Sequence, residues 1–232
     1  MRNPIGIGDA SNNDTNQNTD WSLAAKRNIK FGIIRASTTG NWVAGKPQII
    51  EDPMFQSNAQ KMADAGVKRM SYHWFDPRFK VCNPIDQAQK FLDVVSKVGV
   101  GELGPMIDLE DAPAAGIYHF AGVGTYVKMW LDAVELVLKV KPRIYTNLNY
   151  ASQYLFGNVK EPWLTDYGLV VASWGSNAPY VPPPWAPTAW DCWQYTAAAP
   201  GAYYGFPAAI PGKAAPNICL SVWNGPLPSE TS

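Results

Sequence analysis

Charged residues are scarce in this chain, and neither sign of charge predominates. Only 16% of the 232 residues are charged, and 19 basic residues balance 19 acidic ones, so the formal net charge is zero. Proteins that bind nucleic acid or an anionic membrane surface usually carry a basic stripe or a polybasic cluster. The sequence contains neither feature, and we therefore expect no nucleic-acid partner.

Cysteine is also scarce. The three cysteines, Cys82, Cys192 and Cys219, are too few and too scattered for a disulfide framework or a structural zinc site. No group of His, Cys and Asp residues has the spacing of metal ligands. We therefore expect neither a metal nor another cofactor.

The sequence lacks a hydrophobic segment suited to a membrane or to export. No apolar run approaches the ~20 residues that a membrane-spanning helix needs. Residues 1–6 lack the apolar core of a signal peptide. These absences predict synthesis in the cytoplasm without a signal peptide, and no membrane insertion.

Strand and helix patterns are what the chain does contain. Up to about residue 150, buried strands alternate with amphipathic helices, which is typical of parallel strands joined by helical crossovers. After that point helices become rare. The expected strands cover 5–11, 31–37, 67–75, 104–111, 142–147, 168–174, 190–196 and 217–223. The sequence therefore predicts an α/β fold, an irregular single-domain β/α barrel of about eight strands with incomplete helical wrapping, over residues 1–225. Residues 226–232 are expected to be a flexible tail.

Two acids end the fourth expected strand. Asp108 and Glu110 are two residues apart, and side chains at i and i+2 of a strand point to the same face. Crowded carboxylates repel each other, which drives their pKa values apart. A protonated acid beside a carboxylate can break a glycosidic bond, although solvated acids are also common at strand ends in α/β proteins.

Other polar side chains end neighbouring strands. Active-site residues of such barrels lie at the C-terminal ends of strands, where we expect Asp9 to join Asp108 and Glu110. Tyr72 and Tyr145 end strands on either side of the acid-bearing strand. We expect both tyrosines to donate hydroxyl hydrogen bonds in the pocket.

Four further residues, His73, Trp174, Trp193 and Arg35, are candidates for binding the substrate. His73 either binds substrate or is a satisfied core histidine. Trp174 and Trp193 either stack on sugar faces or fill the core. Arg35 is expected to form an internal ion pair with Asp9 or Asp108, as buried arginines usually pair with a carboxylate.

Several motifs, in order along nearly the whole chain, resemble those of glycoside hydrolase family 25, the lysozyme-type N-acetylmuramidases that bacteriophages often encode. The opening Ile7-Gly8-Asp9-Ala10-Ser11 is similar to the family's Gly-Ile-Asp-x-Ser, and Asp108-Leu109-Glu110 is similar to its Asp-x-Glu pair. The remaining matches are Phe31–Ser37, Ala65-Gly66-Val67 with Tyr72-His73-Trp74, Lys141–Thr146 and Trp193–Thr196.

This resemblance implies a peptidoglycan hydrolase that cleaves the β-1,4 bond between N-acetylmuramic acid and N-acetylglucosamine with retention. It implies that Glu110 is the general acid that protonates the leaving oxygen, and that Asp108 stabilises the positively charged intermediate. Asp9 would hold a hydrogen bond in the same pocket. The implied partner is bacterial peptidoglycan, with action at the cell wall, either as a free endolysin or attached to a larger phage particle.

One departure from the family pattern concerns the last strand. The family usually places an Asp there, and this chain has Cys219 at the corresponding position. A thiol carries no charge at neutral pH unless its pKa falls well below ~8.5. An alternative function is therefore a non-catalytic wall-binding or virion-structural module on a decayed barrel. A chitinase-like hydrolase ranks last, because the longer acidic run of that family is absent.

Overall fold

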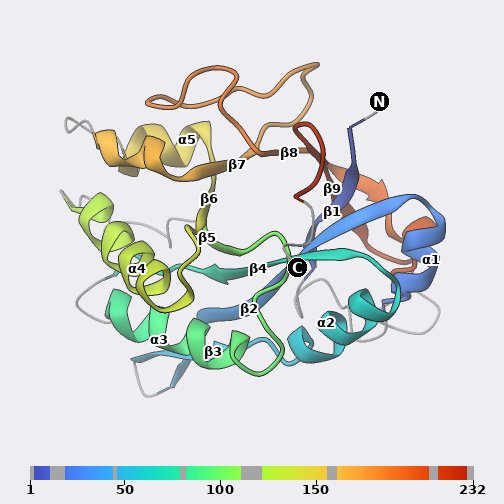
Figure 1. Cartoon of the computed structure of the whole chain (residues 1–232), viewed down its shortest axis with the longest axis horizontal. Coiled ribbons are helices and arrows are strands. Elements are labelled where there is room, and N and C mark those ends of the chain that lie inside the picture. The colour runs from blue at the N-terminus through green and yellow to red at the C-terminus, as the bar shows by residue number, and fades with distance from the viewer. Residues whose placement is uncertain are drawn as a thin grey trace.

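The computed structural model describes residues 3–10, 19–43, 46–78, 82–110, 122–155, 161–208 and 214–228. Within these residues eight strands form a closed barrel (Figure 1). They are β1 (Ile5–Ala10), β2 (Ile29–Val43), β4 (Lys68–Trp74), β5 (Pro105–Leu109), β6 (Arg143–Asn147), β7 (Gly168–Ala172), β8 (Cys192–Pro200) and β9 (Asn217–Trp223). The irregular eight-stranded barrel expected from the sequence is thus confirmed.

Within the ring, only the last strand runs in the opposite direction to the others. The strands from β1 and β2 through β4, β5, β6 and β7 to β8 pair in parallel. The last strand, β9, runs antiparallel to both β8 and β1 and so closes the ring. A ninth strand, β3 (Lys46–Glu51), pairs antiparallel with the far end of β2 and lies outside the ring.

Helices cover only part of the barrel. The helices are α1 (Trp21–Lys26), α2 (Phe55–Asp64), α3 (Pro84–Val95), α4 (Val123–Leu138) and the short α5 (Leu148–Tyr150), which continues as a π-helical turn over Ala151–Leu155. Between β7 and β8 the chain forms irregular loops instead of a helix, and these lie across the top of Figure 1. The expected incomplete wrapping is confirmed.

Local sequence signals explain where these helices begin and end. The side chain of Asn83 accepts a hydrogen bond from the backbone of Ile85, and Pro84 occupies the first helical position of α3, which are both favoured helix starts. Helix α4 ends at Lys139, whose φ of 57° is left-handed. Just before α2, the Asp52 carboxylate bonds to Arg35 and accepts from the backbone N–H of Met54.

Alternation along the strands separates two hydrophobic cores. Large side chains such as Phe31, Met70 and Met106 form an inner core that fills the barrel. Their neighbours, including Ile34 and Ile107, face outwards and pack with helix residues in an outer core. Because successive strand residues point to opposite faces, each strand contributes to both cores. This alternation decides which polar residues can reach the inside of the barrel.

The ordered structure extends beyond the bounds expected from the sequence at two places, the end of β2 and the C-terminal segment. Strand β2 extends to Val43 and forms a hairpin with β3, whereas only residues 31–37 were expected to be extended. At the other end of the chain, Leu227 packs against the inner core and Lys68 Nζ donates to the carbonyl of Pro228 at 2.5 Å. The first residues of the expected flexible tail are therefore packed, and residues 229–232 lie outside the described part.

Across the ranges that the structure describes, no helix combines the length and the apolar character needed to cross a membrane.

Candidate active site

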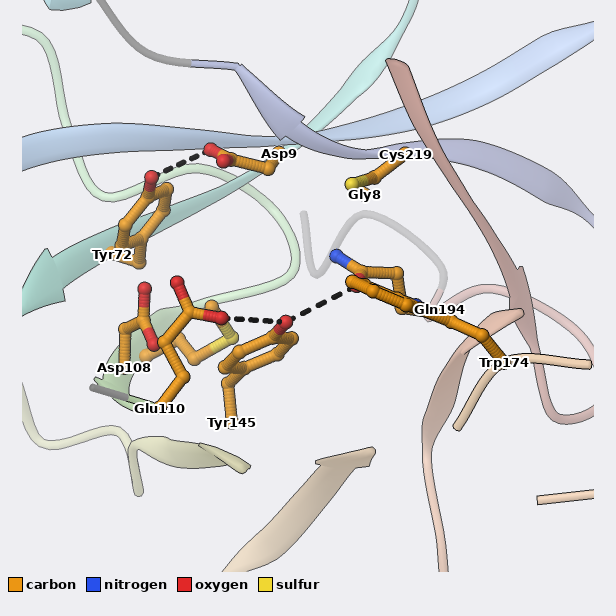
Figure 2. Close-up of a pocket in the computed structure, with 10 residues that line it drawn as sticks. Gly8, Asp9, Tyr72, Asp108, Glu110, Tyr145, Trp174, Gln194 and Cys219 are labelled. Carbon is orange, nitrogen blue, oxygen red and sulfur yellow. Dashed lines mark hydrogen bonds between the residues drawn. The ribbon is translucent and has the colours of Figure 1, made fainter. Parts of the chain in front are cut away.

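A cavity of about 200 Å³ opens at the C-terminal ends of the parallel strands. It brings together residues from six strands and from the segments that follow β5 and β7. The lining residues are Gly8, Asp9, Tyr72, Met106, Asp108, Glu110, Tyr145, Trp174, Gln194 and Cys219 (Figure 2). Six of the nine residues expected from the sequence to form the site are therefore gathered here.

Strand β5 supplies the central pair of acids. Met106, Asp108 and Glu110 alternate along the chain, and all three face the cavity, as the i, i+2 spacing predicted. The two carboxylates differ in their access to water. Asp108 is 5% exposed, whereas Glu110, one residue beyond the end of the strand, is exposed. One acid is thus enclosed by the barrel, and the other stands at its mouth.

The third acid, Asp9, lies at a point in β1 where that strand contains one extra residue relative to β2. Ile7 pairs with Gly32 and Ala10 with Ile34, so three steps along β1 match two along β2. Such a bulge reorients the side chains that follow it. Ile7 and Ala10 both face the outer core, and both residues between them line the cavity. Gly8 and Asp9 are therefore consecutive residues that both face the cavity at this bulge.

Gly8 also leaves no room for a larger residue. A Cβ atom at this position would lie 2.6 Å from Ser221 Oγ and 3.1 Å from Cγ of Gln194. Both distances are shorter than an ordinary van der Waals contact between non-bonded atoms. The close approach of β1 to β8 and β9 at the cavity wall thus requires glycine.

Two buried tyrosines hydrogen-bond to the acids. Tyr72 Oη donates to Asp9 Oδ1 at 2.6 Å, and Tyr145 Oη lies 3.1 Å from Glu110 Oε2 (Figure 2). Burial raises the pKa of Tyr72 well above its usual value, and the neighbouring Asp9 charge adds to the effect. Burial, followed by the Glu110 charge, likewise raises the pKa of Tyr145. Both hydroxyls therefore stay protonated and act as donors at neutral pH, as expected from the sequence.

Gln194 extends this network and was not anticipated as a site residue. Its Oε1 lies 3.1 Å from Tyr145 Oη and accepts from Trp174 Nε1 at 3.1 Å. The sequence carried a signal for it, because Gln194 falls in the Trp193-Gln194-Tyr195 motif. On β8, Cys192 faces the inner core and Trp193 the outer one, so alternation sends Gln194 into the cavity.

A second cavity of about 340 Å³ adjoins the first. Glu110, Tyr145 and Trp174 line both. The other residues of the second cavity are Asn147, Leu148, Asn149, Ala172, Ser173 and Tyr180. Trp174 and Tyr180 are largely exposed, at 58% and 66%. The exposed acid Glu110 thus stands at the junction between an acidic cavity and one lined by aromatic rings and amides.

His73 does not reach either cavity. It follows Tyr72 on β4, and because Tyr72 points inwards, alternation turns His73 outwards. The His73 ring is completely buried and stacks on Trp130 of α4. Its Nδ1 lies 2.8 Å from Ser37 Oγ, and its Nε2 lies 3.0 Å from Gln87 Oε1. The structure thus selects the core interpretation of His73 over substrate binding.

The hydrogen bonds also fix the tautomer of His73. Gln87 Oε1 accepts from the backbone N–H of Asp76, while Gln87 Nε2 donates to the Asp76 carbonyl. Because this oxygen is an acceptor, His73 Nε2 must carry the proton, and Nδ1 accepts from Ser37. Burial lowers the pKa of His73 to about 4, so the ring is neutral in the folded protein.

We expect this neutral histidine to make the fold sensitive to acid. The unfolded chain takes up a proton near the ordinary pKa of about 6.5, whereas the folded chain does so only near 4. The stabilisation is therefore fully present above pH 6.5 and is lost as the pH falls towards 4, by up to about 1.4 kcal/mol per pH unit. Urea midpoints at pH 7.0 and 5.0 should show the loss. In His73→Phe, which keeps a ring against Trp130, the difference between the two midpoints should shrink; an unchanged difference would contradict the assignment.

Two other expected site residues also lie outside the cavities. Arg35 pairs with Asp52, with Nε and Nη2 both 2.8 Å from Oδ2, whereas an ion pair with Asp9 or Asp108 was expected. Trp193 packs against the outer core, and its Nε1 donates to the carbonyl of Ser173 at 2.7 Å. Trp193 therefore packs on the outer side of the barrel. The tryptophan that lines the two cavities is Trp174, in the loop after β7.

The chain matches a known family across most of its length. The model of glycosyl hydrolases family 25 matches residues 9–201, a range that includes Asp9, Asp108 and Glu110. The chain belongs to glycosyl hydrolase family 25.

Solved structures of lysozymes and of an endolysin catalytic domain share this fold. A bacterial lysozyme from Streptomyces coelicolor superimposes with a TM-score of 0.72 at 20% identity, over 97% of this chain and 94% of that one. A family GH25 lysozyme from Aspergillus fumigatus gives 0.70 at 23% identity, over 96% and 94%. The catalytic domain of endolysin ply40, from bacteriophage P40 of Listeria monocytogenes, gives 0.66 at 19% identity, over 97% and 94%.

Curated relatives are less informative about activity. The protein YegX of Escherichia coli O157:H7, described as uncharacterized, is 29% identical over 150 residues, which cover 62% of this chain and 50% of YegX. The chain thus spans about half the length of the curated relatives that it matches.

Within family 25, the expected departure of this chain lies inside the site. Cys219 on β9 lines the acidic cavity, near Gly8 in Figure 2. The cavity therefore contains three carboxylates and a thiol where the family resemblance implied four carboxylates. Among the residues that the structure describes, no three His, Cys, Asp or Glu side chains are grouped so that they could hold a metal ion.

Proposed function

We propose that this chain is a peptidoglycan hydrolase that cleaves the β-1,4 bond between N-acetylmuramic acid and N-acetylglucosamine, with bacterial cell wall as its substrate and site of action. The observation that carries the proposal is the convergence of Asp9, Asp108 and Glu110 in one cavity that opens into a second. Family membership supports the same reaction class. The paired cavities provide space for a sugar on each side of the scissile bond.

Glu110 is suited to the role of general acid. It stands at the junction of the two cavities, where the oxygen between two bound sugars would lie. It is exposed, so it can exchange protons with water between turnovers. Proton donation to the leaving oxygen is the step that glycosidic bond cleavage requires.

Asp108 is suited to stabilising the positive charge that develops on the sugar. Its carboxylate is 5% exposed at the base of the acidic cavity, and a charge acts more strongly where water is excluded. We propose that Asp108 also orients the N-acetyl group of the substrate, whose oxygen attacks the anomeric carbon. Water then attacks from the side vacated by the leaving sugar, and the configuration is retained.

Asp9 and the two tyrosines complete the cavity around the sugar. Asp9 accepts from Tyr72 at 2.6 Å and lines the same cavity as Asp108. We propose that Asp9 holds a hydrogen bond to the bound sugar. We also propose that the catalytic domain spans residues 1–225, because β9, which closes the barrel, lies beyond the end of the family match.

Product analysis on purified peptidoglycan tests this proposal. New reducing ends should appear, and borohydride reduction should convert them to muramitol. Glucosaminitol would mean that the other glycosidic bond is cleaved, and the muramidase assignment would then be wrong. If peptidoglycan pulls the protein down but no reducing ends appear, the chain is a wall-binding module. Nuclear magnetic resonance of the first product formed should show the β-anomer; an α-anomer would contradict retention.

A further inference from the structure

The hydroxyl of Tyr145 lies beside two hydrogen-bond acceptors but has only one proton to donate. Tyr145 Oη lies 3.1 Å from Glu110 Oε2 on one side and 3.1 Å from Gln194 Oε1 on the other (Figure 2). A phenol has a single proton to donate. Tyr145 can therefore donate either to Glu110 or to Gln194, and the two acceptors compete for it.

Trp174 determines which atom of Gln194 takes part in this competition. The indole Nε1 of Trp174 can only donate a hydrogen bond, and it lies 3.1 Å from Gln194 Oε1. The amide of Gln194 is thereby held with its oxygen towards both Trp174 and Tyr145. Without this donor, the amide could turn and present its NH₂ group to Tyr145, and the competition would disappear.

The outcome of the competition depends on the protonation of Glu110. When Glu110 carries a proton, it can donate to Tyr145 Oη, and Tyr145 donates to Gln194, so every partner is satisfied. When Glu110 is ionised, Tyr145 donates to the carboxylate, and Gln194 Oε1 loses that donor. The oriented amide therefore favours the protonated form of Glu110 by the energy of one hydrogen bond.

We infer that Gln194, oriented by Trp174, is a positioning residue that keeps Glu110 protonated and ready to act as an acid. This inference rests on the proposed role of Glu110. Neither Gln194 nor Trp174 needs to touch the reacting atoms for the effect, because it passes through the hydroxyl of Tyr145.

Other titratable and charged groups also act on this part of the cavity. Strands β1, β2, β4, β5, β6 and β9 each contribute one. None of these groups is altered when the indole N–H is removed, so a Trp174 variant isolates the hydrogen-bond chain. These groups are Asp9 on β1, Arg35 on β2, Tyr72 on β4, Asp108 on β5, Tyr145 on β6 and Cys219 on β9.

The decisive variant is Trp174→Phe, which keeps an aromatic ring but removes the donor. The protein is labelled with glutamate carrying ¹³C at the side-chain carboxyl, and the Glu110 signal is assigned by its loss in Glu110→Gln. We expect the titration midpoint of Glu110 to fall by about one pH unit, the size of one hydrogen bond to an ionised group. The alkaline limb of the kcat/KM profile should move down by the same amount.

Two controls separate this chain of hydrogen bonds from other effects. Trp163→Phe removes an indole N–H that bonds to Glu161 at 2.5 Å, away from both cavities, and should leave the titration unchanged. In a Tyr145→Phe background, adding Trp174→Phe should produce no further shift.

Several results would overturn the inference: no shift in Trp174→Phe, an equal shift in the Tyr145→Phe background, or a change in KM alone. If the protein cleaves no peptidoglycan, the proposed function fails, and the titration midpoint still decides whether the positioning role is correct.

Discussion

Replacing Glu110 by Gln is expected to lower kcat for peptidoglycan by about 10²- to 10⁴-fold, the usual contribution of a general acid. The amide fills the same space and can still accept from Tyr145, but it has no proton to give to the leaving oxygen. Release of reducing ends, measured at saturating substrate, reports the loss. Glu135→Gln is the matched control, because Glu135 lies on α4 outside both cavities, and its activity should equal that of the wild type. Full activity in Glu110→Gln would assign the acid to another residue.

Replacing Asp108 by Asn is expected to lower kcat by about 10²- to 10³-fold, the range seen when one preorganised electrostatic group is lost. The amide preserves the shape of this buried site, so the loss reports the missing negative charge beside the positively charged intermediate. Unfolding by urea should be measured alongside, to show that the variant folds. A folded variant with wild-type kcat would contradict the stabilising role.

A substrate with a good leaving group distinguishes these two roles. An aryl β-glycoside whose phenolate departs without protonation has little need of a general acid. Glu110→Gln should therefore recover most of its activity on the aryl substrate, whereas Asp108→Asn should remain impaired, because the positive charge still develops on the sugar. Equal rescue of both variants would mean that the two carboxylates share one function.

The acid pair could be predicted from the sequence because its position depends only on local geometry. The i, i+2 spacing of Asp108 and Glu110 holds for any extended strand, and it placed both side chains in one cavity. The barrel was also predictable, since strands alternate with helices up to about residue 150 and eight strands can be recognised along the chain. Both results follow from short-range rules that need no knowledge of which strands pair.

The same alternation rule explains why two of the candidate ring-bearing residues, His73 and Trp193, lie outside the cavities. Tyr72 and His73 are adjacent on β4, so both could not line the cavity, and Trp193 and Gln194 on β8 present the same choice. The sequence alone did not say which member of each pair faces inwards. That choice follows from closure of the barrel, which places Met70 and Cys192 in the inner core and thereby fixes the direction of every second residue after them.

Other features depended on contacts that the sequence does not encode locally. Arg35 pairs with Asp52, which lies 17 residues away in the sequence, and not with one of the strand-end acids. The hairpin formed by β2 and β3 was missed because residues 38–43 are rich in Thr, Gly and Asn, which are typical of turns. In each case a tertiary contact outweighed the local preference.

The bulge in β1 lets the chain length vary at the site without changing the number of acids in it. Deleting Gly8 would leave Ile7, Asp9 and Ala10 in ordinary alternation, paired with β2 in step. Ile7 and Ala10 would still face the outer core, and Asp9 would still face the cavity. The extra residue therefore adds backbone to the cavity wall and leaves the three carboxylates in place.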